Sequence, residues 1–206
     1  MSQSEIPAFD ELRFDERKHI YTIDQTQLPS VTTIMKPLSS DVYGDVRETT
    51  LEKAANRGTA VHNAIENYIV FGIDDIPSEY VGYYDAFKRW VTDYSPVFLG
   101  TECRVYHRIM RYAGTIDLPC IINGETVCVD FKTTSKVNDD LVRVQLEAYD
   151  KAFSSHGFTF DKKAIVHLGK DGKYKFLMYD KNDMYSWKLF DALYTLYGHR
   201  QKNKRS

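Results

Sequence analysis

Cysteine is scarce in this chain, and its spacing suits neither a disulfide nor a thiolate framework. The 206 residues contain only three cysteines, at positions 103, 120 and 128. An odd number without a Cys-x-x-Cys spacing provides neither a disulfide scaffold nor a four-thiolate metal site. We therefore expect a reducing, intracellular setting.

Long apolar runs are also missing. No stretch approaches the roughly 20 apolar residues that are needed to cross a bilayer, so we expect no membrane partner. Residues 1–7 lack the basic and apolar segments of a secretory signal, which favours a cytoplasmic protein. The chain has no G-x-x-x-x-G-K-[S/T] loop, so no ATP is expected as a cofactor.

An excess of one charge is absent too. The formal net charge is −2, from 27 basic and 29 acidic residues, and such a balance does not by itself indicate a polyanionic ligand. The distribution is less even at the C-terminus, where Arg200, Lys202, Lys204 and Arg205 form a basic tail. Two interpretations of this tail stay open, a phosphate contact and a frayed, solubilising end.

The most informative segment covers residues 114–132. It holds two apolar, β-branched runs around Asn123-Gly124, which is the strongest short-range signal for a hairpin with a two-residue turn. Continuing this register outward places Asp117 directly opposite Asp130, on a rung where Cα atoms lie about 4.5 Å apart. Like charges that face each other destabilise a sheet, and a bound cation would reverse that effect.

The alternation of side chains along a strand puts Lys132 on the same face as Asp130. The opposite face is apolar and predicts a core face, made of Ile116, Leu118, Cys120, Ile122, Val127, Val129 and Phe131. The charged face is either a site or a solvated outer surface. Two carboxylates and the Phe131 carbonyl form an oxygen-rich set that suits Mg²⁺ or Mn²⁺. An ammonium beside them indicates hydrolysis of a phosphodiester.

The rest of the pattern mixes helices and strands. We expect helices at residues 31–35, 46–71, 77–93, 139–155 and 181–197, and strands at 12–14, 19–23, 98–109, 164–168 and 174–179 besides the hairpin. Pro37 should end the first helix. In the second, Leu51, Ala54, Ala55, Val61, Ile65 and Ile69 should form the buried stripe. This order predicts an α/β or α+β fold with a mixed central β-sheet flanked by helices.

Four separated motifs resemble the PD-(D/E)xK nuclease superfamily. They occur in the expected order over residues 58–149 and read Gly58-Thr-Ala-Val-His62, Gly114-Thr-Ile-Asp117, Val129-Asp-Phe-Lys-Thr133 and Gln145-Leu-Glu-Ala-Tyr149. Within the superfamily, the set is most similar to the RecB-like branch, which includes the lambda-type phage exonucleases. The resemblance implies a restriction-endonuclease-like core.

The resemblance also implies roles for the residues of the hairpin. Asp117, Asp130 and the Phe131 backbone carbonyl would bind the catalytic metal, and Lys132 would assist the attacking water. His62 would supply an imidazole ligand from the upstream helix.

Further candidates are less specific. Glu66 lies four residues after His62 on the same helical face and is a further metal ligand, a partner that supports His62, or a solvated glutamate. Glu102 stands where many relatives carry an acidic residue. Gln145 and Tyr149 resemble an element that lines the DNA path, and Arg57 is a candidate phosphate contact.

The function implied is a Mg²⁺- or Mn²⁺-dependent DNA exonuclease that hydrolyses phosphodiester bonds from DNA ends. It would act in phage or bacterial recombination or repair, in the cytoplasm of a bacterium or a phage-infected host cell. A structure-specific endonuclease or resolvase of the same fold, and a non-catalytic DNA-binding relative, stay open as alternatives. Some relatives hold an iron–sulfur cluster with three late cysteines. No cysteine follows Cys128 here, so no such cluster is expected.

DNA is the expected partner, and the resemblance leaves open a single-strand annealing or recombinase protein and a homo-oligomer. We expect a single nuclease domain over residues 1–206. Its parts would be an N-terminal hairpin extension (1–40), a nuclease core (46–180), and a C-terminal helix with the basic tail (181–206).

Overall fold

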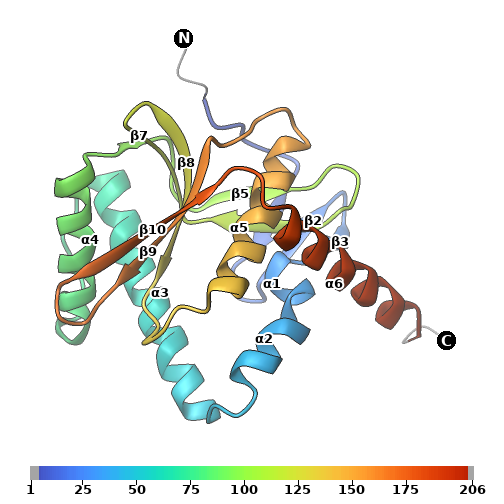
Figure 1. Ribbon diagram of the computed structural model, residues 1–206, viewed down its shortest axis with the longest axis horizontal. Coiled ribbons are helices and arrows are strands. Elements are labelled where there is room, and N and C mark those ends of the chain that lie inside the picture. The colour runs from blue at the N-terminus through green and yellow to red at the C-terminus, as the bar shows by residue number, and fades with distance from the viewer. Residues whose placement is uncertain (1–4, 204–206) are drawn as a thin grey trace.

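A five-stranded mixed sheet forms the centre of the molecule (Figure 1). The structure, a computed structural model, describes residues 5–203. The strand order is β10 (Tyr174–Asp180), β9 (Lys162–Leu168), β8 (Glu125–Lys132), β7 (Leu118–Ile122) and β4 (Val97–Phe98). Only β8 and β9 are parallel, and α5 (Asp139–Ser154) connects them. The expected mixed sheet flanked by helices is thus confirmed.

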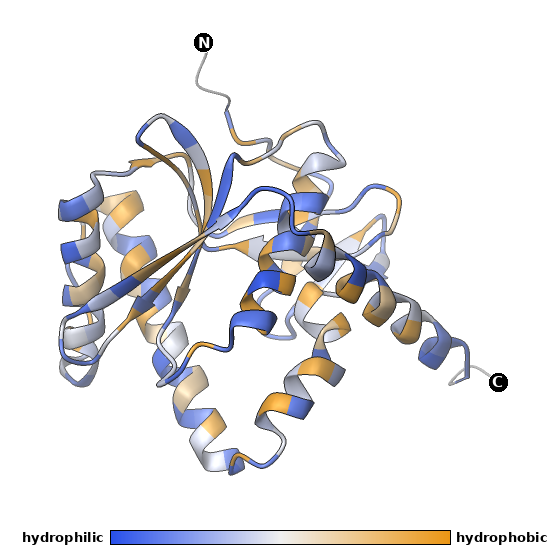
Figure 2. Cartoon of the chain, viewed as in Figure 1, coloured by the Kyte–Doolittle hydropathy of each residue, from blue (hydrophilic) through white to orange (hydrophobic). Residues whose placement is uncertain are grey.

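Helices cover both faces of this sheet. α5 packs on one face, and α3 (Glu48–Phe71) and α4 (Val81–Tyr94) pack on the other (Figure 1). Hydrophobic and hydrophilic residues alternate along the helices, as expected for helices that bury one side (Figure 2). Phe131 enters the core under α3 and α4, whereas Cys128 enters the core under α5.

The apolar face of the hairpin is buried as predicted, and of the two interpretations of the charged face the solvated outer surface does not hold. Asp130, on the charged face, is only 3% exposed. The reason is the parallel pairing of β8 with β9, because a parallel pair needs a crossover and the crossover helix covers that face.

Two smaller sheets and the remaining helices surround this core. They are β1 (Arg13–Asp15), β2 (Ile20–Ile23) and β3 (Thr26–Leu28) in one sheet, β5 (Cys103–Tyr106) and β6 (Ala113–Ile116) in the other, then α1 (Val31–Ile34), α2 (Lys36–Tyr43), η1 (Ser78–Tyr80) and α6 (Met184–Asn203). The sequence pattern missed β3. It also predicted that Pro37 ends a helix. Instead, Pro37 lies in the first turn of the next helix, α2, where a proline costs no hydrogen bond. Among residues 5–203, none of the helices has the length and apolarity to cross a membrane.

The C-terminal end of the long helix α3 was predicted correctly, but its buried stripe was predicted correctly only in the second half of the helix. It stops at Gly72, whose φ of 68° is the left-handed cap that glycine favours. Val61 and Ile65 are buried as expected, but Leu51 is 42% exposed and Ala55 is exposed. The first half of α3 extends beyond the sheet toward α2 (Figure 1). The apolar stripe there consequently lines open cavities instead of a core.

The hairpin register is confirmed, but its ladder stops one residue before the aspartate pair. Leu118 pairs with Val129, and the register continues to Ile122 opposite Glu125. Asp117 lies between β6 and β7, and β6 pairs with β5 in the separate two-stranded sheet. The expected Asp117–Asp130 rung is therefore replaced by a junction between two sheets.

The C-terminal helix is longer than predicted. α6 runs from Met184 to Asn203, so Arg200 and Lys202 of the basic tail lie in its last turn. Lys204 and Arg205 lie outside the described residues.

Candidate metal centre

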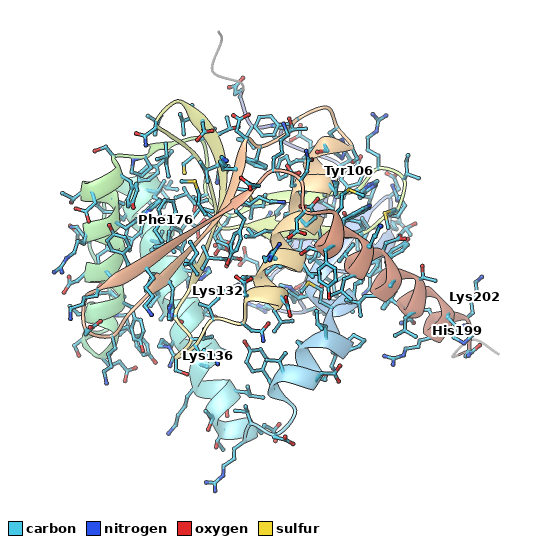
Figure 3. The ribbon with its side chains drawn as sticks, in the orientation of Figure 1. Tyr106, Lys132, Lys136, Phe176, His199 and Lys202 are labelled. Atoms are coloured by element: carbon cyan, nitrogen blue, oxygen red, sulfur yellow. The ribbon has the colours of Figure 1, made fainter. Side chains whose placement is uncertain are left out.

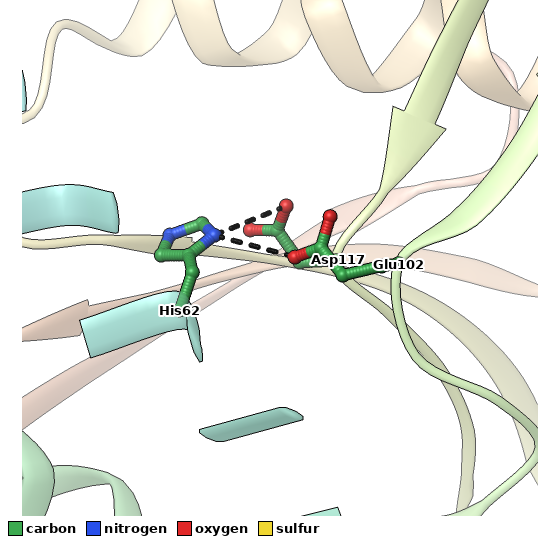
Figure 4. Close-up of side chains that lie close together, drawn as sticks. All are labelled: His62, Glu102 and Asp117. Carbon is green, nitrogen blue, oxygen red and sulfur yellow. Dashed lines mark ion pairs between the residues drawn. The ribbon is translucent and has the colours of Figure 1, made fainter. Parts of the chain in front are cut away.

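An imidazole and two carboxylates converge at the junction between β6 and β7 (Figure 4). His62 Nδ1 lies 3.6 Å from Glu102 Oε1 and 3.6 Å from Asp117 Oδ1. One donor atom from each of the three residues lies within 4.8 Å of the other two. Nitrogen and oxygen ligands of this kind suit a divalent cation.

His62 is oriented by the sheet. It lies in the buried half of α3, and its Nε2 is 3.2 Å from the Phe131 carbonyl oxygen. A carbonyl can only accept, so Nε2 donates and Nδ1 faces the carboxylates. Such a contact fixes the ring in the way that supports metal-binding histidines. The Phe131 carbonyl, predicted as a ligand, thus lies next to the centre and contacts His62.

Glu102 reaches the centre through a bend. The sequence predicted one strand over residues 98–109, but the chain breaks between β4 and β5, and Glu102 has a φ of 48°. Its backbone N–H donates to the Asp117 carbonyl at 2.9 Å, and the Thr101 hydroxyl donates to the same oxygen at 3.2 Å. A left-handed glutamate costs on the order of 1–3 kcal/mol, and such residues often cluster at functional sites. Thr101, which supports this bend, carried no signal in the sequence.

Asp117 and Asp130 approach each other without sharing a rung. Asp117 Oδ2 accepts a hydrogen bond of 2.7 Å from the Phe131 backbone N–H. Asp130 is paired with Lys132, whose Nζ lies 2.7 Å from Asp130 Oδ2. Asp130 is not one of the three residues that converge, so its place in a metal site stays a prediction.

Lys132 is held from a second side by α5. Its ammonium donates to Gln145 Oε1 at 3.2 Å, and Gln145 Nε2 donates to the Tyr149 hydroxyl at 3.0 Å. Tyr149 is 4% exposed, and a Cβ added to Gly114 would lie 2.4 Å from its ring. Glycine is thus required under the tyrosine. These contacts favour a positioning role for Gln145 and Tyr149 behind Lys132, and a direct DNA contact stays a prediction.

The charges of the centre depend on one another. Burial lowers the pKa of His62, but the negative charges of Asp117, Glu102 and Asp130 outweigh it and raise this pKa to about 9. Burial raises the pKa of Asp117 to about 7, helped by Asp130 and Glu102 and opposed by His62. The metal-free centre therefore holds protons near neutral pH, and a cation would have to displace them.

Lys132 stays charged in this setting. Burial lowers its pKa, but Asp130 and Asp117 raise it further, so the net pKa lies above the ordinary value for lysine. Its side chain is therefore an ammonium at neutral pH and cannot act as a proton acceptor there.

Glu66 and Arg57 lie near the centre without joining it. Glu66 lines a cavity of about 530 Å³ together with His62 and Glu102, but it is outside the converging group. Burial, then Glu102 and Glu16, raise the pKa of Glu66. Arg57 Nε donates to Thr133 Oγ1 at 3.3 Å, and both residues line a different cavity.

No protein-family model matches the chain, and no curated protein matches it in sequence. Among solved structures it is similar to one described as LHK-Exo in complex with dAMP, with a TM-score of 0.48, 10% identity, and coverage of 86% of this chain and 89% of that one. A second is an alkaline exonuclease (LHK-Exo) from Laribacter hongkongensis, with a TM-score of 0.39, 11% identity, and coverage of 70% and 84%. A third, described as SSO0001, has a TM-score of 0.35, 13% identity, and coverage of 81% and 82%. These values assign neither a family nor an activity to this chain.

Proposed function

We propose that this chain is a metal-dependent nuclease of the PD-(D/E)xK superfamily that hydrolyses DNA phosphodiester bonds. The observation that carries the proposal is the convergence of His62, Glu102 and Asp117 beside an ion-paired Lys132. We assign the activity to a single nuclease domain with its core at residues 46–180.

The donor set fits a hard divalent cation, because it offers carboxylate oxygens and one imidazole nitrogen within reach of one another. When bound, Mg²⁺ or Mn²⁺ supplies positive charge for a phosphate oxygen and acidifies a coordinated water. His62, Glu102 and Asp117 would hold it. Asp130 and the Phe131 carbonyl, which lie beside them, are further ligands in this proposal.

Lys132 supplies a fixed positive charge next to the reacting phosphate. Asp130 and Gln145 hold its ammonium from two sides, so little reorganisation is needed as negative charge develops on the phosphate. Since its pKa is raised, Lys132 orients the attacking water or stabilises charge, and it does not remove the proton.

We further propose that the enzyme acts from DNA ends, in recombination or repair in a bacterial or phage-infected cell. Two features favour an exonuclease over the structure-specific endonuclease. They are His62 on α3 and the Gln145–Tyr149 pair on α5, both near the hairpin that carries Asp130 and Lys132.

The test is digestion of end-labelled linear DNA and closed circular DNA with Mg²⁺, Mn²⁺ or EDTA. We expect linear DNA to be shortened to nucleotides or short oligomers with either metal, closed circles to survive, and EDTA to stop the reaction. Rapid nicking of closed circles would instead favour the structure-specific endonuclease. DNA binding without any cleavage would favour the non-catalytic relative.

A further inference from the structure

Two adjoining cavities lie along Lys132 and the loop that follows it. The first, of about 370 Å³, is lined by Lys132 and Gln145. The second, of about 660 Å³, lies between α3, the loop after β8 and the turn between β9 and β10. The two share Tyr43, Leu51 and Thr134 in their linings, so they are direct neighbours. We call the second cavity the basic groove.

The charged side chains that line the basic groove have one sign. They are Lys53, Arg57, Lys136 and Lys170, and within residues 5–203 the lining includes no aspartate or glutamate. Lys53, Lys136 and Lys170 are exposed. In Figure 3, Lys132 is labelled near the middle of the view with Lys136 just below it, whereas Lys202 lies to the right at the end of α6.

A third cavity, which His62 lines, has the opposite character. Glu16, Glu66 and Glu102 line it, and Arg104 is the only lysine or arginine among the described residues of its lining. Without a bound cation, a phosphate chain would meet repulsion there and attraction in the basic groove. The chain as a whole has a net charge of only −2, so this contrast is local and is not a consequence of composition.

Contacts between its walls hold the basic groove open. Arg57 is bonded to Thr133 of the loop after β8, and His167 Nε2 donates to the Thr134 carbonyl at 2.6 Å. On the opposite wall, a Cβ added to Gly82 would lie 1.9 Å from the Lys170 carbonyl oxygen. α4 therefore packs directly on the turn that carries Lys170. The basic residues of the groove therefore lie on elements that contact one another, which lowers the entropy lost when a ligand binds.

We propose that the basic groove binds the sugar-phosphate backbone of the DNA strand on one side of the scissile phosphate. The strand then reaches the metal centre past Lys132 and does not cross the acidic cavity. This inference rests on the proposed function and adds the direction from which the substrate enters.

The test compares two triple variants of equal charge. The groove variant carries Lys53→Ala, Lys136→Ala and Lys170→Ala. The control carries Lys18→Ala, Arg89→Ala and Lys188→Ala, which are exposed residues outside the groove. Affinity for a labelled single-stranded oligonucleotide is measured by anisotropy at several salt concentrations. Ca²⁺ replaces Mg²⁺, and the length of the oligonucleotide is checked afterwards.

The groove variant should bind at least tenfold more weakly than the wild type, and the control within about twofold. Each phosphate contact contributes about 0.7 to the slope of log affinity against log salt for a single strand, so the slope should shrink by about 2. Equal affinity and slope in the two variants would overturn the proposal.

A small diester separates this proposal from the proposed function. Bis(p-nitrophenyl) phosphate can reach the metal centre without touching the groove, so the groove variant should hydrolyse it at the wild-type rate while its KM for DNA rises. A matching loss on the small diester would also overturn the groove assignment. A wild-type protein that cleaves neither substrate contradicts the proposed function itself, whereas cleavage by the wild type with no effect of the groove variant contradicts only the groove.

Discussion

At the scale of single residues, the contacts of Lys132 keep its side chain charged and also fix the position of its ammonium group. Asp130 is buried and faces the ammonium at 2.7 Å, while Gln145 holds it from α5. A lysine placed in this way cannot swing toward solvent without leaving a buried carboxylate unpaired. Its charge is thus fixed in place before any substrate arrives.

We predict that Lys132→Ala lowers kcat by about 10²–10³, the usual loss when one preorganised electrostatic contact is removed. DNA affinity should change little, because the contact is made mainly as charge develops. Lys132→Arg should not restore the rate, since a planar guanidinium cannot replace a compact ammonium. Single-turnover kinetics with saturating Mg²⁺ measures this effect, and a near wild-type rate would contradict the mechanism.

Removal of Lys132 also has a structural consequence. It leaves Asp130 buried and unpaired, and breaking such a pair is strongly destabilising. The melting temperature of Lys132→Ala in EDTA should fall, and Lys132→Ala combined with Asp130→Asn should recover part of it. Kinetics must therefore be measured well below the melting temperature of each variant.

Asp117 gives a prediction in which the size of the effect on stability depends on pH. Its pKa is about 7 in the folded protein, above the ordinary 3.8, so the folded state holds this proton more tightly. The stability linked to protonation is complete below about pH 3.8 and is lost as pH rises through 7. Asp117→Asn removes this loss. In EDTA it should raise the melting temperature at pH 8 by clearly more than at pH 5, and it should have little effect near pH 4.

Thermal melts of both proteins in EDTA at these pH values measure this difference. A gain that is the same at pH 5 and pH 8 would mean that Asp117 does not titrate in this range. About 1 kcal/mol corresponds to about 2–4 °C in a protein of this size, so the shift is measurable.

At the scale of secondary-structure elements, two glycines in the motifs have different physical roles. Gly114 of β6 lies under the Tyr149 ring of α5, and a Cβ there would be 2.4 Å from a ring carbon. Gly58 of α3 has more space, because a Cβ would meet only Thr133 Oγ1, at 4.0 Å. The close approach of strand and helix therefore depends on Gly114 and not on Gly58.

We predict that Gly114→Ala destabilises the protein and lowers activity, because Tyr149 must move and Gln145 then loses its partner behind Lys132. Gly58→Ala is the matched control. It should keep or raise the melting temperature, since alanine is favoured over glycine by up to about 1 kcal/mol inside a helix. Melting curves and cleavage rates of the two variants test this. Equal stability of both would show that the ring does not restrict position 114.

At the scale of the whole molecule, the candidate centre joins parts of the chain that fold into different layers. His62 comes from α3, Glu102 from the bend before β5, and Asp117 from the junction of two sheets. A cation bound by all three would link these parts and stabilise only the folded state.

We predict that Mg²⁺ or Mn²⁺ raises the melting temperature. The expected gain is about 2.7 kcal/mol when the metal concentration is 100 times the Kd. Asp117→Asn and Glu102→Gln should abolish the shift. Glu66→Gln should keep it, because Glu66 lines the same cavity but lies outside the converging group. An unchanged shift in Asp117→Asn or Glu102→Gln would mean that these carboxylates are not ligands.

Several features of this protein were determined by the sequence alone, because each depends on residues close together in the chain. The Asn123-Gly124 turn set the hairpin register that the structure has, since a two-residue turn allows only one alignment of its strands. Gly72 ended α3 through its left-handed cap. The four-residue spacing of Gln145 and Tyr149 put them on one side of α5, where their side chains meet.

Tertiary structure decided the rest. The burial of Asp130, the exposed first half of α3 and the break of the strand at Asp117 depend on which elements pack together, and turn chemistry does not encode that choice. The meeting of His62, Glu102 and Asp117 depends on a bend at Glu102 held by the Asp117 carbonyl. Such contacts join residues far apart in the chain, so their geometry exists only once the layers have packed.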